Sequence, residues 1–164
     1  MTSIVRATFE LRNQRMRRLV ALALTLTALC SCAAGHSSYA PEYITPNGPP
    51  PPTRPFSPAV RVGDMLYLAG QIGTDSSGKI VPGGIQAETR QALSNIRGLL
   101  LRNGSSLDRV VRCLVMVADM NEWPAMNEVY ATFFPTHFPA RSAIGANGLA
   151  LGARVEIECT AVTG

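Results

Sequence analysis

Two side chains near the C-terminus, Arg141 and Glu156, are of chemical types that can bind or react with a ligand. Arg141 lies in the segment FPARS (138–142), and a guanidinium is a permanently charged, planar fork of donors that matches a carboxylate. Glu156 begins a Glu-Ile-Glu segment, and a positioned carboxylate can orient a water and transfer protons. Residue types alone leave a structural alternative for each: an Arg141 paired with an acidic residue, and a solvated strand charge at Glu156 or Glu158.

The segments around these residues have the patterns of strands. Residues 154–162 alternate, with Val155, Ile157, Cys159 and Ala161 on one face and Glu156, Glu158 and Thr160 on the other. AVRV (59–62), a Gly63-Asp64 turn and MLYLAG (65–70) predict a hairpin. Residues 110–120 and 141–147 predict two further strands.

Two helices are predicted between the strands. Apolar residues between Gly84 and Asn103 recur with a period near 3.6, and residues 121–134 begin at an Asn121 cap with Pro124 in the first turn. The mixture predicts an α+β domain. Two helices cover one face of a sheet, whereas several strands are apolar on both faces, so we infer that other subunits cover the second face.

The N-terminal end has the order of an export signal. From Met16 the chain has two arginines, an apolar stretch from Leu19 to Leu29 and then small residues. The stretch is shorter than the ~20 apolar residues that span a bilayer. Residues 1–33 are therefore predicted to be a cleavable segment, with Met16 as the true start because the tract before it adds nothing that a signal peptide requires.

The end of this segment resembles a bacterial lipobox, Leu29-Cys30-Ser31-Cys32, which predicts a lipoprotein acylated at Cys32. Ordinary cleavage after Ala33 or Ala34 is the equal alternative. Either outcome predicts an exported protein, periplasmic or lipid-anchored to the cell envelope, that meets a membrane only through its N-terminus. The Pro-rich residues 34–53 predict a semi-rigid tether to a domain over 54–164.

Charge and cysteine usage exclude several classes of function. The net charge of +4 comes largely from residues 1–53, with five Arg against two Glu, whereas residues 54–164 hold ten Lys and Arg against nine Asp and Glu, so no nucleic-acid partner is predicted. No Cys-x-x-Cys pair exists, and His36 and His137 are far apart, so no metal site is predicted. Cys113 and Cys159 are expected to be buried small hydrophobes, with a disulfide as the lesser alternative that the predicted export keeps open.

Three segments together, 55–73, 127–144 and 155–162, resemble the RidA/YjgF family of enamine/imine deaminases. The resemblance covers the whole predicted domain. It implies a chorismate-mutase-like α+β single domain, a mixed β-sheet with two helices on one face. It also implies a homotrimeric barrel with pockets at the subunit interfaces. The implied reaction is hydrolysis of 2-enamine or 2-imine carboxylates to 2-oxo acids and ammonia, with no cofactor.

The resemblance also implies roles for particular residues. Arg141 matches the arginine that binds the substrate carboxylate, and Glu156 matches the carboxylate that positions the attacking water. The other substrate-binding positions are Phe56, Ala69, Gly70, Gln71, Asn127 and Ala143. Of these, Phe56, Ala69 and Ala143 replace the Tyr, Ser and Cys of active members, so a less polar pocket and a bulkier or more apolar substrate are expected.

The polar atoms that Phe56, Ala69 and Ala143 lack, relative to active family members, favour an alternative function. This alternative is a non-catalytic trimeric module that binds small carboxylates. The ribonuclease activity ascribed to some relatives is disfavoured because residues 54–164 are nearly neutral and lack basic clusters.

Overall fold

The computed structural model describes residues 39–45 and 55–164. The predicted export segment, with Met16 and Cys32, lies outside the described residues. The strands are β1 (Glu42–Ile44), β2 (Ala59–Val62), β3 (Met65–Leu68), β4 (Gln71–Ile72), β5 (Val110–Val117), β6 (Ala140–Gly145) and β7 (Val155–Val162). The helices are α2 (Gly84–Arg102) and α3 (Trp123–Thr132), with 3-10 turns η1 (Leu107–Arg109), η2 (Met120–Glu122) and η3 (Ala150–Gly152).

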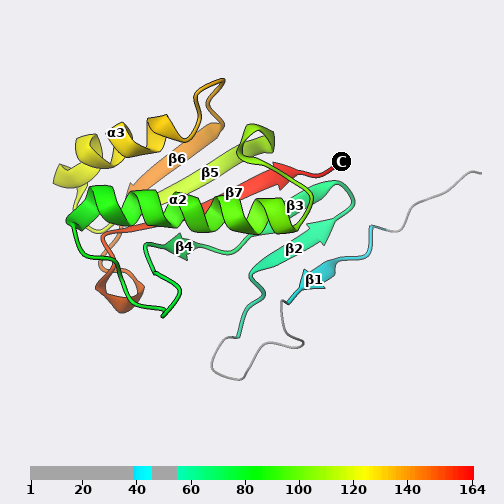
Figure 1. Ribbon diagram of the computed structural model, residues 1–164, viewed down its shortest axis with the longest axis horizontal. Helices are drawn as coiled ribbons and strands as arrows, with labels where there is room; N and C mark the ends of the chain where they lie inside the picture. The colour runs from blue at the N-terminus through cyan, green and yellow to red at the C-terminus, as the bar shows by residue number, and fades with distance from the viewer. Residues whose placement is uncertain (1–38, 46–54) are drawn as a thin grey trace, which may run out of the picture. The chain divides into compact units, whose positions relative to one another are not determined.

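All seven strands form one mixed sheet in the order β1-β2-β3-β7-β5-β6, with β4 also paired to β7 (Figure 1). Among the strands of the described residues, only β5 and β6 run parallel, and α3 connects them. The other pairs are antiparallel. Strand β7 is therefore central, and β6 lies at an edge. The predicted hairpin, the two later strands and the α+β class are confirmed.

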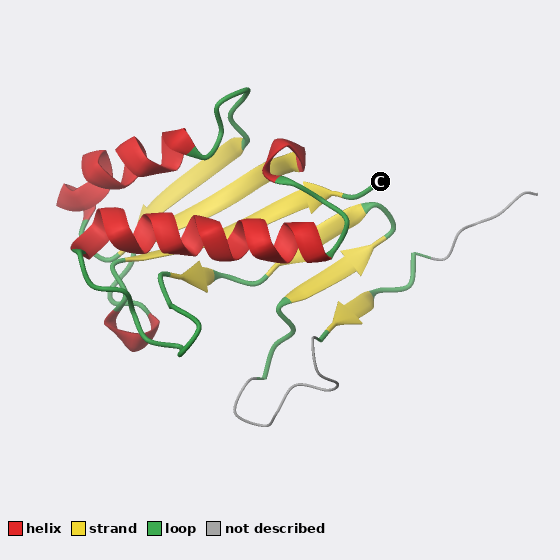
Figure 2. Cartoon of the chain, in the orientation of Figure 1, coloured by secondary structure: helices red, strands yellow, loops and turns green. Residues whose placement is uncertain are grey.

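Both helices lie on the same face of the sheet (Figures 1 and 2). Apolar side chains of α2, such as Leu93 and Ile96, form one core with strand residues such as Val115 and Ile157. On the opposite face several large apolar side chains remain exposed: Tyr67, Val111 and Ile144. Strands that look apolar on both faces are thus buried on only one face within a single chain.

The start of the second helix differs from the sequence expectation. The carboxylate of Asp119 accepts the backbone N–H of Asn121 at 2.9 Å and caps η2, and α3 begins only at Trp123. The predicted Asn121 cap is therefore wrong: Asp119 caps the preceding turn η2, and Glu122, at the N-cap position of α3, makes no side-chain cap bond. Pro124 does lie in the first turn of α3, where a missing N–H costs nothing.

Part of the predicted tether belongs to the sheet. Residues Glu42–Ile44 pair antiparallel with β2, so the folded unit begins before Arg54. An ion pair of 3.4 Å between Glu42 and Arg61 joins the two strands. A short strand can be added at an exposed edge by main-chain hydrogen bonds alone, which a Pro-rich composition obscures.

Cys113 and Cys159 form a disulfide, so the expectation of two free cysteines is wrong. The two residues are direct cross-strand partners in the antiparallel β5–β7 pair, and their Cα atoms are 4.1 Å apart, just under the ~4.4–6.8 Å usual for disulfides. Both are buried, as expected. Sequence patterns do not show the register that brings together two residues 46 positions apart.

Candidate functional site

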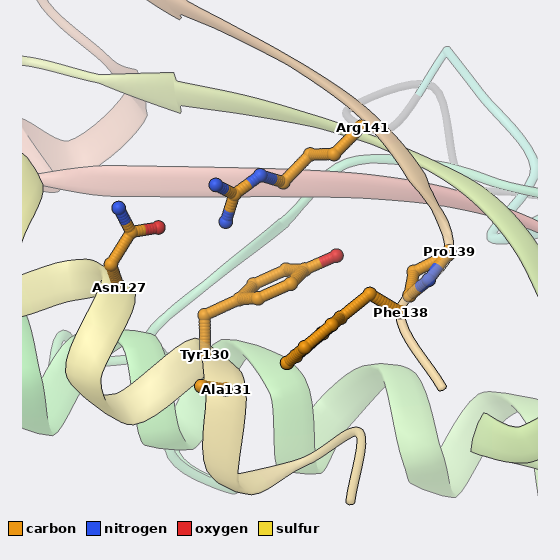
Figure 3. Close-up of a pocket in the computed structure, with 6 residues that line it drawn as sticks. All are labelled: Asn127, Tyr130, Ala131, Phe138, Pro139 and Arg141. Atoms are coloured by element: carbon orange, nitrogen blue, oxygen red, sulfur yellow. The ribbon is translucent and has the colours of Figure 1, made fainter. Parts of the chain in front are cut away.

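The guanidinium of Arg141 lies over two aromatic rings of α3, those of Trp123 and Tyr130. Figure 3 shows it beside the Tyr130 ring. The Cζ atom of Arg141 is 4.5 Å from the ring centre of Tyr130 and 4.9 Å from that of Trp123. Within residues 39–45 and 55–164, no Asp or Glu forms an ion pair with Arg141. The alternative of a structurally paired arginine is therefore wrong for this part of the chain, and the cation is free to bind an anionic ligand.

A cavity of about 400 Å³ lies beside this guanidinium. The residues that line it are Asn127, Tyr130, Ala131, Phe138, Pro139 and Arg141. Arg141 reaches it from β6, and Asn127 and Tyr130 reach it from α3 (Figure 3). The lining is mostly apolar apart from the guanidinium and the Asn127 amide, which suits a ligand with one carboxylate and an apolar body.

The sequence did not predict the cavity-lining residues Ala131, Phe138 and Pro139 or the two α3 aromatic residues that contact Arg141. Trp123 and Tyr130 share one face of α3 with the predicted Asn127, because spacings of four and then three residues bring side chains together on a helix. That spacing was visible in the sequence, but only the packing of α3 against β6 shows that the face meets Arg141.

Tyr130 is 3% exposed, and its hydroxyl has no hydrogen-bond partner among the described residues. Burial raises the pKa of Tyr130 to about 12, against the opposing effect of the Arg141 charge. The phenol therefore stays neutral in the folded protein over a wider pH range than in the unfolded chain, whose tyrosine titrates near 10.

We expect Tyr130→Phe to change the pH dependence of stability. A raised folded pKa contributes stability that is complete below pH 10 and is lost as the pH rises to about 12. For wild type this loss is up to about 3 kcal/mol, at ~1.4 kcal/mol per pKa unit. At pH 7 the variant should be at least as stable, because it removes an unpaired hydroxyl. Urea unfolding of both proteins between pH 7 and 12 measures this, and equal pH slopes would refute the expectation.

A second group of predicted residues surrounds Glu156. Glu156 is half-buried on β7, where Ile72 of β4 is its cross-strand partner. Its carboxylate lies so close to Gly70 that a Cβ there would collide with Oε1. The Gln71 side chain donates to the carbonyls of Ala69 and Gly70 at 3.1 and 3.0 Å, which holds this loop in shape. The absence of a side chain at Gly70 thus allows the Glu156 carboxylate to lie close to the backbone of this loop.

The two groups lie on opposite faces of the sheet. Ala143, two residues beyond Arg141 on β6, packs against the core on the helix side. Glu156 alternates with the buried Val155 and Ile157 and so faces away from the helices. One strand separates β6 from β7, and their registers place the two Cα atoms roughly 14 Å apart from strand spacing and rise. A single chain therefore does not bring Arg141 and Glu156 together.

The remaining predicted positions are also dispersed. Phe56 is 54% exposed and does not line the cavity, nor do Ala69 and Ala143. Among the described residues, no three His, Cys, Asp or Glu side chains gather as they would around a metal ion. No helix in the described ranges has the length and apolarity to cross a membrane.

The fold and site define a class of protein: a single α+β domain in which an arginine, unpaired among the described residues, lies between an edge strand and a helix. The profile of the family described as Endoribonuclease L-PSP matches residues 47–163. The 2-iminobutanoate/2-iminopropanoate deaminase of Mus musculus is 42% identical over 129 residues, 78% of this chain and 96% of that protein. The Homo sapiens deaminase is 42% identical over 111 residues, 67% of this chain and 81% of that protein.

Solved structures show the same relationship. The crystal structure of yeast Mmf1 matches with a TM-score of 0.70 and 34% identity, covering 76% of this chain and 100% of that chain. RidA from the Antarctic bacterium Psychrobacter matches with a TM-score of 0.67 and 30% identity, covering 74% and 98%. The chain belongs to the endoribonuclease L-PSP, or RidA, family.

Proposed function

We propose that this protein hydrolyses 2-iminocarboxylates, and their 2-enamine tautomers, to 2-oxo acids and ammonia. The observation that carries the proposal is the Arg141 guanidinium, unpaired among the described residues, beside a cavity of about 400 Å³ with a largely apolar lining. The relatives named as 2-iminobutanoate/2-iminopropanoate deaminases support it. The cavity accommodates a small amino-acid-derived carboxylate, and its aromatic walls suit an apolar side chain.

In the proposed reaction, Arg141 holds the substrate carboxylate by two parallel hydrogen bonds. The Asn127 amide lies beside the Arg141 guanidinium (Figure 3). Water adds to the C=N carbon, the nitrogen gains protons, and the C–N bond breaks to leave a 2-oxo acid and ammonia. Glu156 orients that water and accepts its proton. Because Glu156 lies on the opposite face from Arg141, the complete site needs the Glu156 of a second copy of the chain.

We propose the homotrimer that the family resemblance implies as the assembly that completes the site. The exposed apolar side chains on the open face of the sheet, Tyr67, Val111 and Ile144, support burial of that face between copies. Sedimentation of the purified domain tests this directly, and a monomer at all micromolar concentrations would oppose both the trimer and the shared site.

The central experiment measures ammonia release from 2-iminobutanoate and larger homologues that an amino-acid oxidase generates in the cuvette. Addition of the protein should accelerate release above the spontaneous rate in water. Bulkier apolar side chains should be accepted, because Tyr130, Phe138 and Pro139 line the cavity. No acceleration for any side-chain size would refute the deaminase proposal.

The glycine at position 70 provides a sharper test of Glu156. In Gly70→Ala the new Cβ would collide with Oε1 of Glu156 and displace the carboxylate. We expect kcat to fall by ~100-fold, as misplacement of a reacting group by about 1 Å can do. Gly78→Ala is the matched control: its φ of +80° makes the substitution strained, but no atom lies within 4 Å of the new Cβ. Equal kcat in the two variants would contradict the role of Glu156.

A non-catalytic carboxylate-binding module is the second candidate. The observation in its favour is that the cavity of one chain is lined by Arg141 and Asn127 but by no carboxylate. In that case 2-oxobutyrate would raise the melting temperature of the native protein without any turnover of imines. RNA cleavage is the least supported activity, and we expect none, because residues 54–164 are nearly neutral.

We propose further that the protein is exported and acts in the cell envelope. The buried Cys113–Cys159 disulfide supports this, because stable disulfides form in oxidising compartments and are rare in the cytosol. The charge and apolar order of residues 16–34 supports it independently. Mass spectrometry of the mature N-terminus distinguishes acylated Cys32 from cleavage after Ala33 or Ala34, and an intact Met1 or Met16 terminus would refute export.

A further inference from the structure

Arg154, the residue just before β7, connects two acidic residues from different elements. Its Nη1 atom donates to Oε1 of Glu122, at the end of η2, at 2.6 Å. Its backbone N–H donates to Oε2 of Glu88, on α2, at 2.8 Å, and its Nε atom is 3.9 Å from Oε1 of the same carboxylate. We refer to Arg154, Glu88 and Glu122 as the Arg154 cluster.

One side of the Arg154 cluster leads to the carboxylate-binding half of the site. Glu122 immediately precedes Trp123, whose ring lies 4.9 Å from the Arg141 guanidinium. The second oxygen of Glu122, Oε2, is buried and has no partner among the described residues. The Arg154 hydrogen bond therefore restrains this carboxylate, and with it the start of α3 and the direction of the Trp123 ring.

The other side leads to Glu156. Glu88 is only 4% exposed, and its backbone packs so tightly on Gly73 that a Cβ there would meet the Glu88 Cα at 2.6 Å. Gly73 follows Ile72, the cross-strand partner of Glu156. Glu88 thus holds the end of β4 by packing and the start of β7 by its hydrogen bond to Arg154. The carbonyl of Arg154 also accepts the N–H of Ala118 at 2.9 Å, beyond the end of β5.

We propose that the Arg154 cluster positions both halves of the site through separate contacts. The Arg154 side chain sets Trp123 against Arg141 through Glu122, and the Glu88 carboxylate sets Glu156 through the Arg154 backbone. None of the three residues lines the Arg141 cavity, so all are positioning residues. The changes in KM and kcat that this inference predicts rest on the proposed deaminase function.

Two substitutions separate the contacts. Arg154→Met keeps the apolar stem and the backbone bond to Glu88 but removes the guanidinium, so KM should rise by about tenfold with kcat nearly unchanged. Glu88→Leu keeps the buried volume but removes the acceptor of the Arg154 N–H, so kcat should fall ~10- to 100-fold with little change in KM. Glu88→Gln retains an acceptor oxygen and should restore most of kcat.

Arg61→Met is the matched control, because it removes an arginine that pairs with Glu42 and bonds the Asn103 carbonyl far from the site. It should lower the melting temperature without changing KM or kcat. The inference is overturned if Arg154→Met and Glu88→Leu change KM and kcat in the same proportion, or if both behave like Arg61→Met. If Glu88→Leu does not fold, Arg154→Met and Glu88→Gln still test the inference. It requires a raised KM in Arg154→Met and a near-normal kcat in Glu88→Gln.

A failure of the proposed function remains distinguishable from a failure of this inference. If wild type hydrolyses no imine, the affinity for 2-oxobutyrate is measured by calorimetry instead. Arg154→Met should then weaken binding by about tenfold, because it disturbs Trp123 beside Arg141, and Glu88→Leu should not. Equal affinity in wild type and Arg154→Met, or no measurable binding by wild type, would overturn the inference independently of catalysis.

Discussion

Arg141→Ala should abolish most of the acceleration of ammonia release. A bidentate arginine–carboxylate contact is two charge-assisted hydrogen bonds, each of about 1.5–3 kcal/mol, so we expect kcat/KM to fall by at least ~100-fold. The folded structure should survive, because among the described residues Arg141 makes no ion pair and only its stacking on Tyr130 and Trp123 is lost. Progress curves at several imine concentrations, with the melting temperature as a check on folding, measure the effect.

Two further variants show whether the geometry or the charge of the Arg141 side chain is responsible for its contribution to activity. Arg141→Lys keeps the positive charge but loses the planar fork, so it should restore only a small part of the activity. Arg90→Ala removes an exposed arginine from α2 and should leave the activity unchanged. Full activity in Arg141→Lys would show that charge alone is sufficient, and full activity in Arg141→Ala would refute the proposed anchoring role.

Removal of the disulfide should have the largest effect on stability. The bridge connects residues 46 positions apart, and the loop-closure relation gives about 4 kcal/mol for a loop of that length. For a domain of this size that corresponds to a fall of roughly 15 °C in melting temperature. The double variant Cys113→Ala/Cys159→Ala, compared with wild type by calorimetry, measures it.

The reduced wild-type protein is the control for lost packing. Both cysteines are buried, so the alanine variant also loses two sulfur atoms from the core. Wild type that is unfolded, reduced and refolded in reductant keeps those sulfur atoms and loses only the covalent link. Its melting temperature should therefore show most of the same decrease. Free thiols at Cys113 and Cys159 in the oxidised native protein, located by alkylation and peptide mapping, would contradict the bridge. Equal melting temperatures would contradict its contribution to stability.

Local patterns were sufficient for most of the fold. The alternation in 154–162 fixes which residues of β7 are buried, and the 3.6-residue period predicts α2 to within one residue. Patterns failed where a longer-range partner decides the outcome. The strand β1 pairs with the free edge of β2, and a 3-10 turn capped by Asp119 precedes α3 in place of the predicted Asn121 cap.

The site was predicted in its residue types but not in its arrangement. The FPARS and Glu-Ile-Glu segments identify Arg141 and Glu156, yet the sequence does not show that they lie on opposite faces. That follows from pairing: Arg141 is in register with Cys113, which faces the helices, and Glu156 is in register with Met116, which faces away. The sequence also does not show that Trp123 and Tyr130 contact Arg141, because that contact depends on the packing of α3 beside β6.

The sequence by itself determined most of the helices and strands, the buried face of β7 and the chemical types of the site residues. Those properties depend on neighbours within a few residues, through helical or strand periodicity. The tertiary structure alone decided the Cys113–Cys159 bridge, the pocket around Arg141 and the separation of Arg141 from Glu156. Each of these depends on the register between strands far apart in the chain, because a shift of one residue moves every side chain to the other face.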